Sequence, residues 1–271
     1  MDARLQRRVQ RYGWDKAAAS YERFWQAQLA PAQRRVLDLA ALAPGERVLD
    51  IACGTGLVTF PAAEQVAPSG QVLATDISDV MVTSLREQAE RRSLGHVRTA
   101  RMDAESLDVP DRSMDVVLCA LGLMYVPDPV RALAEMHRVL VPGGRAVVAV
   151  WGARARCGWA DIFPIVDARV QSEVCPMFFQ LGTGDQLRAT MQEAGFAEPA
   201  IERISSVLHY DSPEEACGAA FAGGPVALAY SRFDDRTRAE AHAEYLESIS
   251  AWRSGDTFDV PGEFVVGTAR R

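Results

Sequence analysis

The chain has 271 residues, and its 36 Asp and Glu against 29 Lys and Arg give a formal charge of −7. A chain of this length can bury the core of one domain with insertions, or of two domains at most. The negative balance provides no global attraction for nucleic acid, so a small-molecule partner is favoured.

The cysteines and the amino terminus indicate the cellular compartment in which the protein resides. Cysteines occur at positions 53, 119, 157, 175 and 217 without a Cys-x-x-Cys pair, which predicts reduced thiols rather than disulfides or a metal site. Residues 1–11 are charged and lack the apolar segment of a secretory signal, and no run approaches the roughly 20 apolar residues that span a bilayer. We therefore expect a cytoplasmic protein without a membrane span. The sequence leaves homo-oligomer formation open.

Residues 1–45 are predicted to form a helical cap that precedes the sheet. Apolar residues recur at helical spacing over 15–29 and again over 32–42, and Pro31 suits the first turn of the second helix. The first of these helices carries Tyr21 and Trp25. Aromatic residues at this spacing most often anchor a core.

The stretch Arg47–Gly56 is the most informative part of the chain. Its first half, Val48-Leu49-Asp50-Ile51, is an apolar run with one carboxylate, typical of a strand buried on both faces of a parallel sheet. A glycine turn and a helical pattern follow. Backbone N–H groups between a strand's carboxyl end and a helix's amino end face a bound ligand, so this pattern predicts a nucleotide or nucleoside site.

Two details of this turn disfavour a dinucleotide and hence a nicotinamide-dependent oxidoreductase. Thr59 stands where a dinucleotide fingerprint has its third glycine. Asp50 would place a fixed negative charge near the ligand, which is unfavourable beside a pyrophosphate. It suits a ligand that carries an ammonium or sulfonium group.

Strand and helix patterns alternate from Arg47 to Trp151, which predicts a parallel sheet with right-handed crossovers. Ser78 resembles a helix cap, and Pro129 falls in the first turn of a later helix. The segments after the glycine turn are a strand over 71–76, a loop over 101–104, a strand over 114–120, a glycine pair at 143–144 and a strand over 145–151.

These stretches together resemble the class I S-adenosylmethionine-dependent methyltransferases, over roughly residues 40–151. The nearest subgroup is the methyltransferase type 11 group that includes the ubiquinone and menaquinone C-methyltransferases. The resemblance implies an α/β fold: a doubly wound, Rossmann-like, seven-stranded sheet, mostly parallel with its last strand antiparallel. It also implies S-adenosyl-L-methionine as cofactor and S-adenosyl-L-homocysteine as product.

The resemblance assigns cofactor contacts along the matched region. Asp76 would bind the ribose hydroxyls, Asp103 and Ala104 would read the adenine edge, and Ile77 and Met81 would enclose the adenine ring. The remaining implied cofactor residues are those of the first motif and the end of the fourth strand: Asp50, Cys53, Gly54, Thr55, Gly56 and Ala120.

Beyond Trp151 two insertions interrupt the expected fold. The predicted divisions are a cofactor-binding core over 46–151, a cap insertion over 152–184, core again over 185–211, a helical cap insertion over 212–255 and a final strand within 256–271. Both insertions should emerge at the carboxyl edge of the sheet, where ligands of open α/β sheets bind. Their aromatic residues predict a lidded, apolar acceptor pocket lined by Trp159, Phe163 and Phe178 together with Trp25 and Tyr125.

Methyl transfer from a sulfonium needs positioning and, for some acceptors, a base. His209, at the end of a strand near the cap, is the leading candidate base, and Tyr21, Tyr125 and Asp185 are weaker ones. Tyr21 is also expected to close over the methyl end of the cofactor.

One difference from the quinone methyltransferases bears on which molecules could accept the methyl group. The quinone enzymes carry Gly-Leu-Arg-Asn after the fourth strand, whereas this chain has Gly-Leu-Met-Tyr at 122–125. The sequence therefore favours a different small acceptor, methylated at oxygen, nitrogen or carbon. Cys157 and Cys175 invite a thiol or metalloid role, but a structural role is favoured. A non-catalytic cofactor-binding regulatory or scaffold protein is the alternative.

Overall fold

A mixed β-sheet forms the centre of the protein, whose computed structural model describes residues 3–170 and 177–271. The strands lie in the order β3-β2-β1-β4-β5-β8-β6, and a two-residue strand, β7, pairs with β8. Strand β8 is antiparallel to both of its main neighbours, whereas β1 to β5 run parallel. This mixed sheet confirms the predicted fold class. The strands are β1 (Arg47–Ile51), β2 (Gln71–Asp76), β3 (Val97–Arg101), β4 (Met114–Ala120), β5 (Leu140–Trp151), β6 (Ala197–Tyr210), β7 (Arg253–Ser254) and β8 (Thr257–Arg270).

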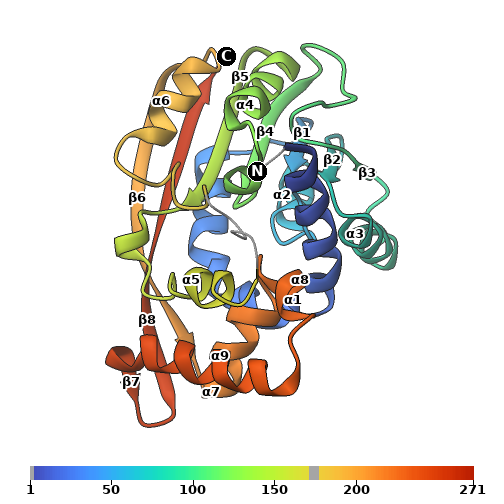
Figure 1. The fold of residues 1–271 in the computed structure, drawn as a ribbon. Coiled ribbons are helices and arrows are strands. Elements are labelled where there is room, and N and C mark those ends of the chain that lie inside the picture. The colour runs from blue at the N-terminus through green and yellow to red at the C-terminus, as the bar shows by residue number, and fades with distance from the viewer. Residues whose placement is uncertain (1–2, 171–176) are drawn as a thin grey trace.

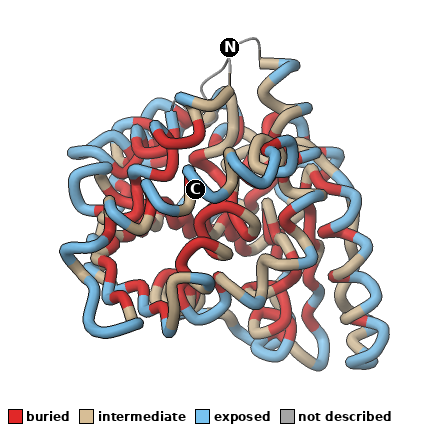
Figure 2. The backbone as a smooth tube through the Cα atoms, turned by 60° about the horizontal axis from the view of Figure 1, so that its bottom comes forward, coloured by how far each residue is buried: buried red, intermediate tan, exposed pale blue. Residues whose placement is uncertain are grey.

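The central strands are buried because the chain covers both of their faces. Val48, Leu49 and Ile51 of β1 are at most 1% exposed, which explains why their sequence is a continuous apolar run rather than an alternating one. Figure 2 shows this pattern for the whole backbone, with buried segments inside and exposed segments at the periphery. No helix among residues 3–170 and 177–271 is long and apolar enough to cross a membrane.

The amino-terminal cap consists of a single helix, α1 (Ala3–Ala40), with Pro31 inside it. The prediction of two helices separated at Pro31 was therefore wrong. Proline removes one helical hydrogen bond, but Leu29, Ala32 and Val36 on both sides of it are at most 4% exposed. Burial of this continuous apolar face compensates for the missing bond.

The other helices follow the sequence signals closely. The Ser78 side chain caps α3 and Pro129 lies in the first turn of α4, both as predicted. Gly195 has a positive φ of 101° just after α6, as is common where a helix ends. The helices are α2 (Thr59–Val66), α3 (Asp79–Arg91), α4 (Pro129–Val139), α5 (Ile162–Asp167), α6 (Gln186–Glu193), α7 (Pro213–Cys217), α8 (Ala227–Tyr230) and α9 (Asp235–Ser248). Short helical turns are η1 (Leu123–Tyr125), η2 (Arg154–Arg156), η3 (Gly218–Ala222) and η4 (Ser250–Trp252).

Both insertions leave the sheet at its carboxyl edge. Strands β5 and β6 are each antiparallel to β8, so they run parallel to each other and end on the same side, at Trp151 and Tyr210. The chain continues from β5 into α5 and from β6 into α7. Figure 1 shows α7 and α9 at the opposite end of β6 and β8 from α6.

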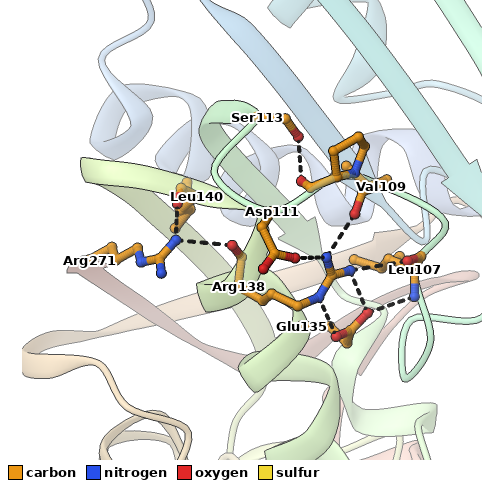
Figure 3. A network of polar contacts seen from close by, with 9 residues as sticks. Leu107, Val109, Asp111, Ser113, Glu135, Arg138, Leu140 and Arg271 are labelled. Atoms are coloured by element: carbon orange, nitrogen blue, oxygen red, sulfur yellow. Dashed lines mark hydrogen bonds and ion pairs between the residues drawn. The ribbon is translucent and has the colours of Figure 1, made fainter.

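A network centred on Arg138 fixes the connection between β3 and β4 (Figure 3). The Arg138 guanidinium of α4 bonds to Glu135 and Asp111 and donates to the backbone oxygens of Leu107 and Val109. Glu135 also accepts from the Leu107 N–H at 2.8 Å. Arg138 and Glu135 thus hold the segment that follows Asp103 against α4.

The Gln28 side chain of α1 forms hydrogen bonds with the backbone of the outer strand β6 near the strand's carboxyl end. Its side-chain oxygen accepts from the His209 N–H at 3.1 Å, and its side-chain amide donates to the His209 carbonyl. These backbone groups face the free edge of the sheet, where unpaired groups would otherwise need water or another chain. Gln28 is 7% exposed, so α1 acts here as a substitute for a neighbouring strand.

This edge contact predicts a stability effect. We expect Gln28→Leu, which preserves side-chain bulk but removes both hydrogen-bonding groups, to lower the free energy of unfolding by about 1–3 kcal/mol. Urea denaturation measures the change. The control is Gln26→Leu at an exposed position of the same helix, with an expected change within about 0.5 kcal/mol. Equal effects of the two substitutions would contradict the edge-closing role.

Candidate functional site

The glycine turn after β1 has a backbone that only glycine adopts easily. Gly54 and Gly56 have φ values of +54° and +101°, and a Cβ added to Gly56 would lie 2.5 Å from the Phe60 ring. Side chains at these positions would be strained by the backbone or would collide with α2. Because the two glycines have no side chains, the backbone of the turn stays accessible at the sheet edge.

Asp50 lies beneath this turn rather than in the cavity above it. It is 1% exposed, and the Thr59 hydroxyl donates to its carboxylate at 2.6 Å. The pKa of Asp50 is raised to about 7, because burial and, to a smaller extent, the nearby charge of Asp76 raise it more than the Thr59 hydrogen bond lowers it. Thr59, which the sequence analysis used only to disfavour a dinucleotide, is thus the partner of the motif's acid.

Asp76, at the end of β2, is held by two backbone donors. Its carboxylate oxygens accept from the Gly54 N–H at 3.0 Å and from the Ser78 N–H at 2.9 Å. Burial raises the pKa of Asp76, and these bonds oppose the shift. A carboxylate has about four lone-pair sites, so Asp76 can accept further hydrogen bonds from a ligand.

Ser78 extends this connection to the amino-terminal helix. Its hydroxyl accepts from the Met81 N–H at 3.1 Å as the cap of α3, and donates to the Asp15 carboxylate of α1 at 2.6 Å. A continuous chain of hydrogen bonds therefore joins the glycine turn, β2, α3 and α1.

A cavity enclosing about 760 Å³ of empty space, part of it open to solvent, lies above these groups. Seven of the predicted cofactor residues line it, whereas Asp50, Cys53, Thr55 and Gly56 belong to the turn and strand that support it. The lining residues are Arg7, Gln10, Trp14, Tyr21, Ile51, Ala52, Gly54, Asp76, Ile77, Met81, Met102, Asp103, Ala104, Ala120, Leu121, Gly122, Tyr125, Val126 and Pro127.

The amino-terminal half of α1 contributes cavity residues that the sequence analysis did not assign. Arg7 forms ion pairs with Glu105 and, at 2.8 Å, with Asp103. Burial raises the pKa of Asp103 and the Arg7 charge opposes this. Arg7 and Trp14 are seven residues apart, as are Trp14 and Tyr21, so helical spacing from Tyr21 was a signal that could have identified them.

A second cavity, here called the aromatic chamber, adjoins the first and encloses about 340 Å³ of empty space. The two cavities share Trp14, Tyr21, Leu121 and Tyr125. The chamber is lined by Trp14, Tyr21, Trp25, Leu29, Leu121, Met124, Tyr125, Trp151, Trp159, Phe178, Gly224 and Pro225.

Four of the five predicted acceptor-pocket residues line the chamber: Trp25, Tyr125, Trp159 and Phe178. The fifth, Phe163, does not. Its ring centroid lies 4.8 Å from that of Phe178 and 6.0 Å from that of Trp159. Phe163 therefore packs against two residues of the chamber wall without lining the chamber itself.

His209 does not reach either cavity, and the geometry rules against the prediction that it is the base. Its side chain is 54% exposed, with Nδ1 at 2.7 Å from Asp259 and Nε2 at 3.1 Å from Asp211. These two carboxylates raise its pKa. Leu208 and Tyr210 are buried, and side chains alternate along a strand, so His209 points outward. Asp185, also considered, has an 84% exposed side chain outside both cavities.

The cysteines add no reactive group to the described cavities. Cys157 is 3% exposed, and burial raises its pKa to about 11, so its thiol is protonated at neutral pH. This agrees with the favoured structural role. Cys175 lies outside the described residues.

The arrangement can position a reactant more readily than it can deprotonate one. Tyr21 stands over Gly54, where an added Cβ would be 3.7 Å from its ring. Burial, with the charges of Asp76 and Glu22, raises the pKa of its phenol, so the hydroxyl stays protonated at neutral pH. Tyr21 and Tyr125 each pack edge-on against Trp14, with centroid distances of 5.7 and 5.1 Å.

Comparisons with known proteins match this region to one family. Residues 48–144 match the family described as "Methyltransferase domain". The chain is 39% identical over 132 residues to the aklanonic acid methyltransferase DauC of Streptomyces sp. (strain C5), covering 49% of this chain and 60% of that protein. It is 44% identical over 113 residues to the ubiquinone/menaquinone biosynthesis C-methyltransferase UbiE of Teredinibacter turnerae (strain ATCC 39867 / T7901), covering 41% and 45%. The chain thus matches less than two thirds of the length of these two relatives.

The matches that cover more of the chain have a lower sequence identity. The nocamycin O-methyltransferase of Saccharothrix syringae is 29% identical over 273 residues, covering 95% of this chain and 97% of that protein. The crystal structure of a putative methyltransferase from Bacillus halodurans C-125 superposes with a TM-score of 0.60 at 20% identity, covering 88% of this chain and 97% of that one. The latter supports the fold, and the family match over residues 48–144 covers most of the region in which the motifs lie.

The buried Asp50 predicts a pH-dependent stability. A carboxyl whose pKa is about 7 when folded and near 3.9 when unfolded favours folding less as pH rises from about 4 to 7, because only the unfolded chain ionises it readily. We expect Asp50→Asn to gain stability relative to the parent protein between pH 5 and pH 8, by at least about 1.4 kcal/mol, the equivalent of one pKa unit. Urea denaturation at both pH values tests this, and a difference that does not change with pH would contradict the assignment.

Proposed function

We propose that the chain carries a class I S-adenosylmethionine-dependent methyltransferase domain and that the protein transfers the methyl group of S-adenosyl-L-methionine to an oxygen, nitrogen or carbon atom of a small organic acceptor. The observation that carries the proposal is the shared boundary of two cavities. The cavity above the glycine turn and the aromatic chamber have Trp14, Tyr21, Leu121 and Tyr125 in common. A group bound in one would there meet a group bound in the other.

The residues of the first cavity fit the cofactor. The glycine turn leaves room for backbone contact, Asp76 has lone pairs left for ribose hydroxyls, and Asp103, just beyond the end of the neighbouring strand β3, is available for the adenine amino group. Ile77 and Met81 supply apolar surface for the adenine ring. When bound, the cofactor supplies an electrophilic sulfonium methyl and needs no metal ion for its transfer.

The protein's own contribution is positioning and exclusion of water. In-line displacement needs the accepting atom at about 3–3.5 Å from the methyl carbon. Tyr21 and Tyr125 lie on the boundary between the cavities, and their rings are held by Trp14. We assign Tyr21 a role through the shape of its ring rather than through its hydroxyl, because its raised pKa keeps the hydroxyl protonated at neutral pH and therefore unable to act as a general base.

The chamber supports a lidded and largely apolar acceptor site. Three segments outside the core contribute to its walls: α1, the 152–184 insertion with Trp159 and Phe178, and the 212–255 insertion with Gly224 and Pro225. The core adds Leu121, Met124, Tyr125 and Trp151. We propose that these three segments form the acceptor site together with core residues 121–125 and Trp151, while residues 46–151 make most of the contacts to the cofactor.

The relatives support a small-molecule acceptor without identifying it. Their names specify aklanonic acid, nocamycin O-methylation and ubiquinone or menaquinone biosynthesis. Tyr125, within the stretch where the sequence departs from the quinone enzymes, lines both cavities. Its position supports an acceptor other than a quinone.

The cofactor assignment predicts the effect of removing Asp76. We expect Asp76→Ala to weaken the affinity for S-adenosyl-L-homocysteine at least tenfold, because charge-assisted bonds of about 1.5–3 kcal/mol each are lost. Isothermal titration calorimetry measures this. Asp185→Ala, at an exposed position outside both cavities, is the control. Unchanged affinity in Asp76→Ala would reject the ribose assignment.

The function itself is tested by transfer of labelled methyl from S-adenosyl-L-methionine into a metabolite extract, with Tyr21 variants in the same assay. We expect labelled small molecules with the parent protein, a loss of less than about tenfold with Tyr21→Phe, and a loss of at least about 10²-fold with Tyr21→Ala, because the ring's shape positions the reactants. Cofactor binding without any labelled product would favour the non-catalytic alternative. A severe defect in Tyr21→Phe with normal cofactor affinity would instead make the phenol a catalytic group.

A further inference from the structure

Two tryptophans that line the aromatic chamber carry buried hydrogen-bond donors that have no partner in the described part of the chain. The indole N–H groups of Trp25 and Trp159 are both buried without a hydrogen bond to any residue in 3–170 or 177–271. The two residues are 6% and 3% exposed, and both line the chamber. Buried polar groups in proteins are nearly always paired, so two such donors in one cavity require an explanation.

The position of one donor is fixed by its neighbours. A Cβ built on Gly223 would lie 3.0 Å from the indole nitrogen of Trp25. The next two residues, Gly224 and Pro225, belong to the chamber wall. The N–H edge of Trp25 therefore lies at the wall that the 212–255 insertion contributes.

The chemistry of the chamber favours an oxygen over a cation as the complementary group. Among the described lining residues there is no Asp, Glu, Lys, Arg or His, so nothing there would neutralise an ammonium. Indole is a donor only and cannot accept a hydrogen bond.

The ring faces are also largely occupied by other rings. Trp159 packs against Trp25, Trp151 and Phe178 at interplanar angles of 72°, 63° and 90°. Edge-to-face packing of this kind covers the π-faces that a cation would need. The indole N–H groups are the polar groups of the two tryptophans, and both lack a partner among the described residues.

Resting on the proposed function, we propose that the methyl acceptor is an oxygen-bearing, otherwise apolar ring compound whose oxygen accepts hydrogen bonds from the indole N–H groups of Trp25 and Trp159. These two residues then act in specificity: they hold an oxygen of the acceptor at the inner wall of the chamber, and the apolar body fills the space toward Tyr21. A site of this kind discriminates against an analogue of the same shape that lacks the oxygen, because the buried donors are then left unpaired.

Three naphthalene probes of similar shape test the proposal on the full chain saturated with S-adenosyl-L-homocysteine. They are 2-acetylnaphthalene, with a carbonyl oxygen, 2-isopropylnaphthalene, without it, and 1-(2-naphthyl)ethylamine, a cation. We expect the ketone to bind at least about tenfold more tightly than the hydrocarbon. In protein labelled with ¹⁵N at the indoles, the Trp25 and Trp159 N–H proton signals should move downfield with the ketone only.

The variants Trp25→Phe and Trp159→Phe, which keep an aromatic ring, should each lower the ketone-to-hydrocarbon ratio to about threefold or less. Trp252→Phe is the matched control, since this tryptophan lines neither cavity, and should leave the ratio unchanged. If a variant fails to fold, the ratio and the indole signals of the parent protein still decide the question.

Equal binding of ketone and hydrocarbon, tightest binding of the amine, or a ratio that neither tryptophan variant changes would each overturn the inference and leave the proposed function standing. Failure of S-adenosyl-L-homocysteine to bind would overturn the proposed function, and this inference with it. The two failures are thus distinguishable in one set of titrations.

Discussion

The site depends on one buried carboxylate, that of Asp76. It accepts from the backbone of Gly54 on one side and of Ser78 on the other, and Ser78 in turn caps α3 and binds Asp15 of α1. A buried charge must be satisfied by hydrogen bonds, so these groups have little freedom to move independently. The glycine turn, the end of β2 and the amino-terminal helix are consequently held in one arrangement at the carboxyl edge of the sheet.

Because α1 is held in this way, it contributes to both cavities. Its amino-terminal part carries Arg7 and Gln10 in the first cavity, and Trp25 and Leu29, further along, line the aromatic chamber. Trp14 and Tyr21 lie between these and belong to both. One helix thus sets the distance between the two cavities, and it also closes the free edge of β6 through Gln28. Stability of the sheet edge and geometry of the site are coupled through the same element.

The elements of the core could be predicted because they follow local rules. A strand, a glycine turn and a helix in succession place backbone groups at a sheet edge whatever the rest of the chain does, and Asp76 and Asp103 occupy the ends of neighbouring strands. Arg7 was missed because its partners, Asp103 and Glu105, lie about a hundred residues away. His209 was misassigned because closeness to the cap in sequence does not fix the direction of a side chain. The alternation of β6 turns it outward, between Asp211 and Asp259.

By itself, the sequence determined the parallel core, the order of its elements, the glycine turn and the acids at the strand ends, since periodicity, turn residues and caps act over a few residues. Only the tertiary structure decided that Pro31 lies inside one continuous helix, that Phe163 stands behind the chamber wall, and that Trp25 and Trp159 meet across the chamber with buried N–H groups. Each of these depends on segments far apart in the chain packing against one another. Burial, which selects among the local options, is a property of the whole fold.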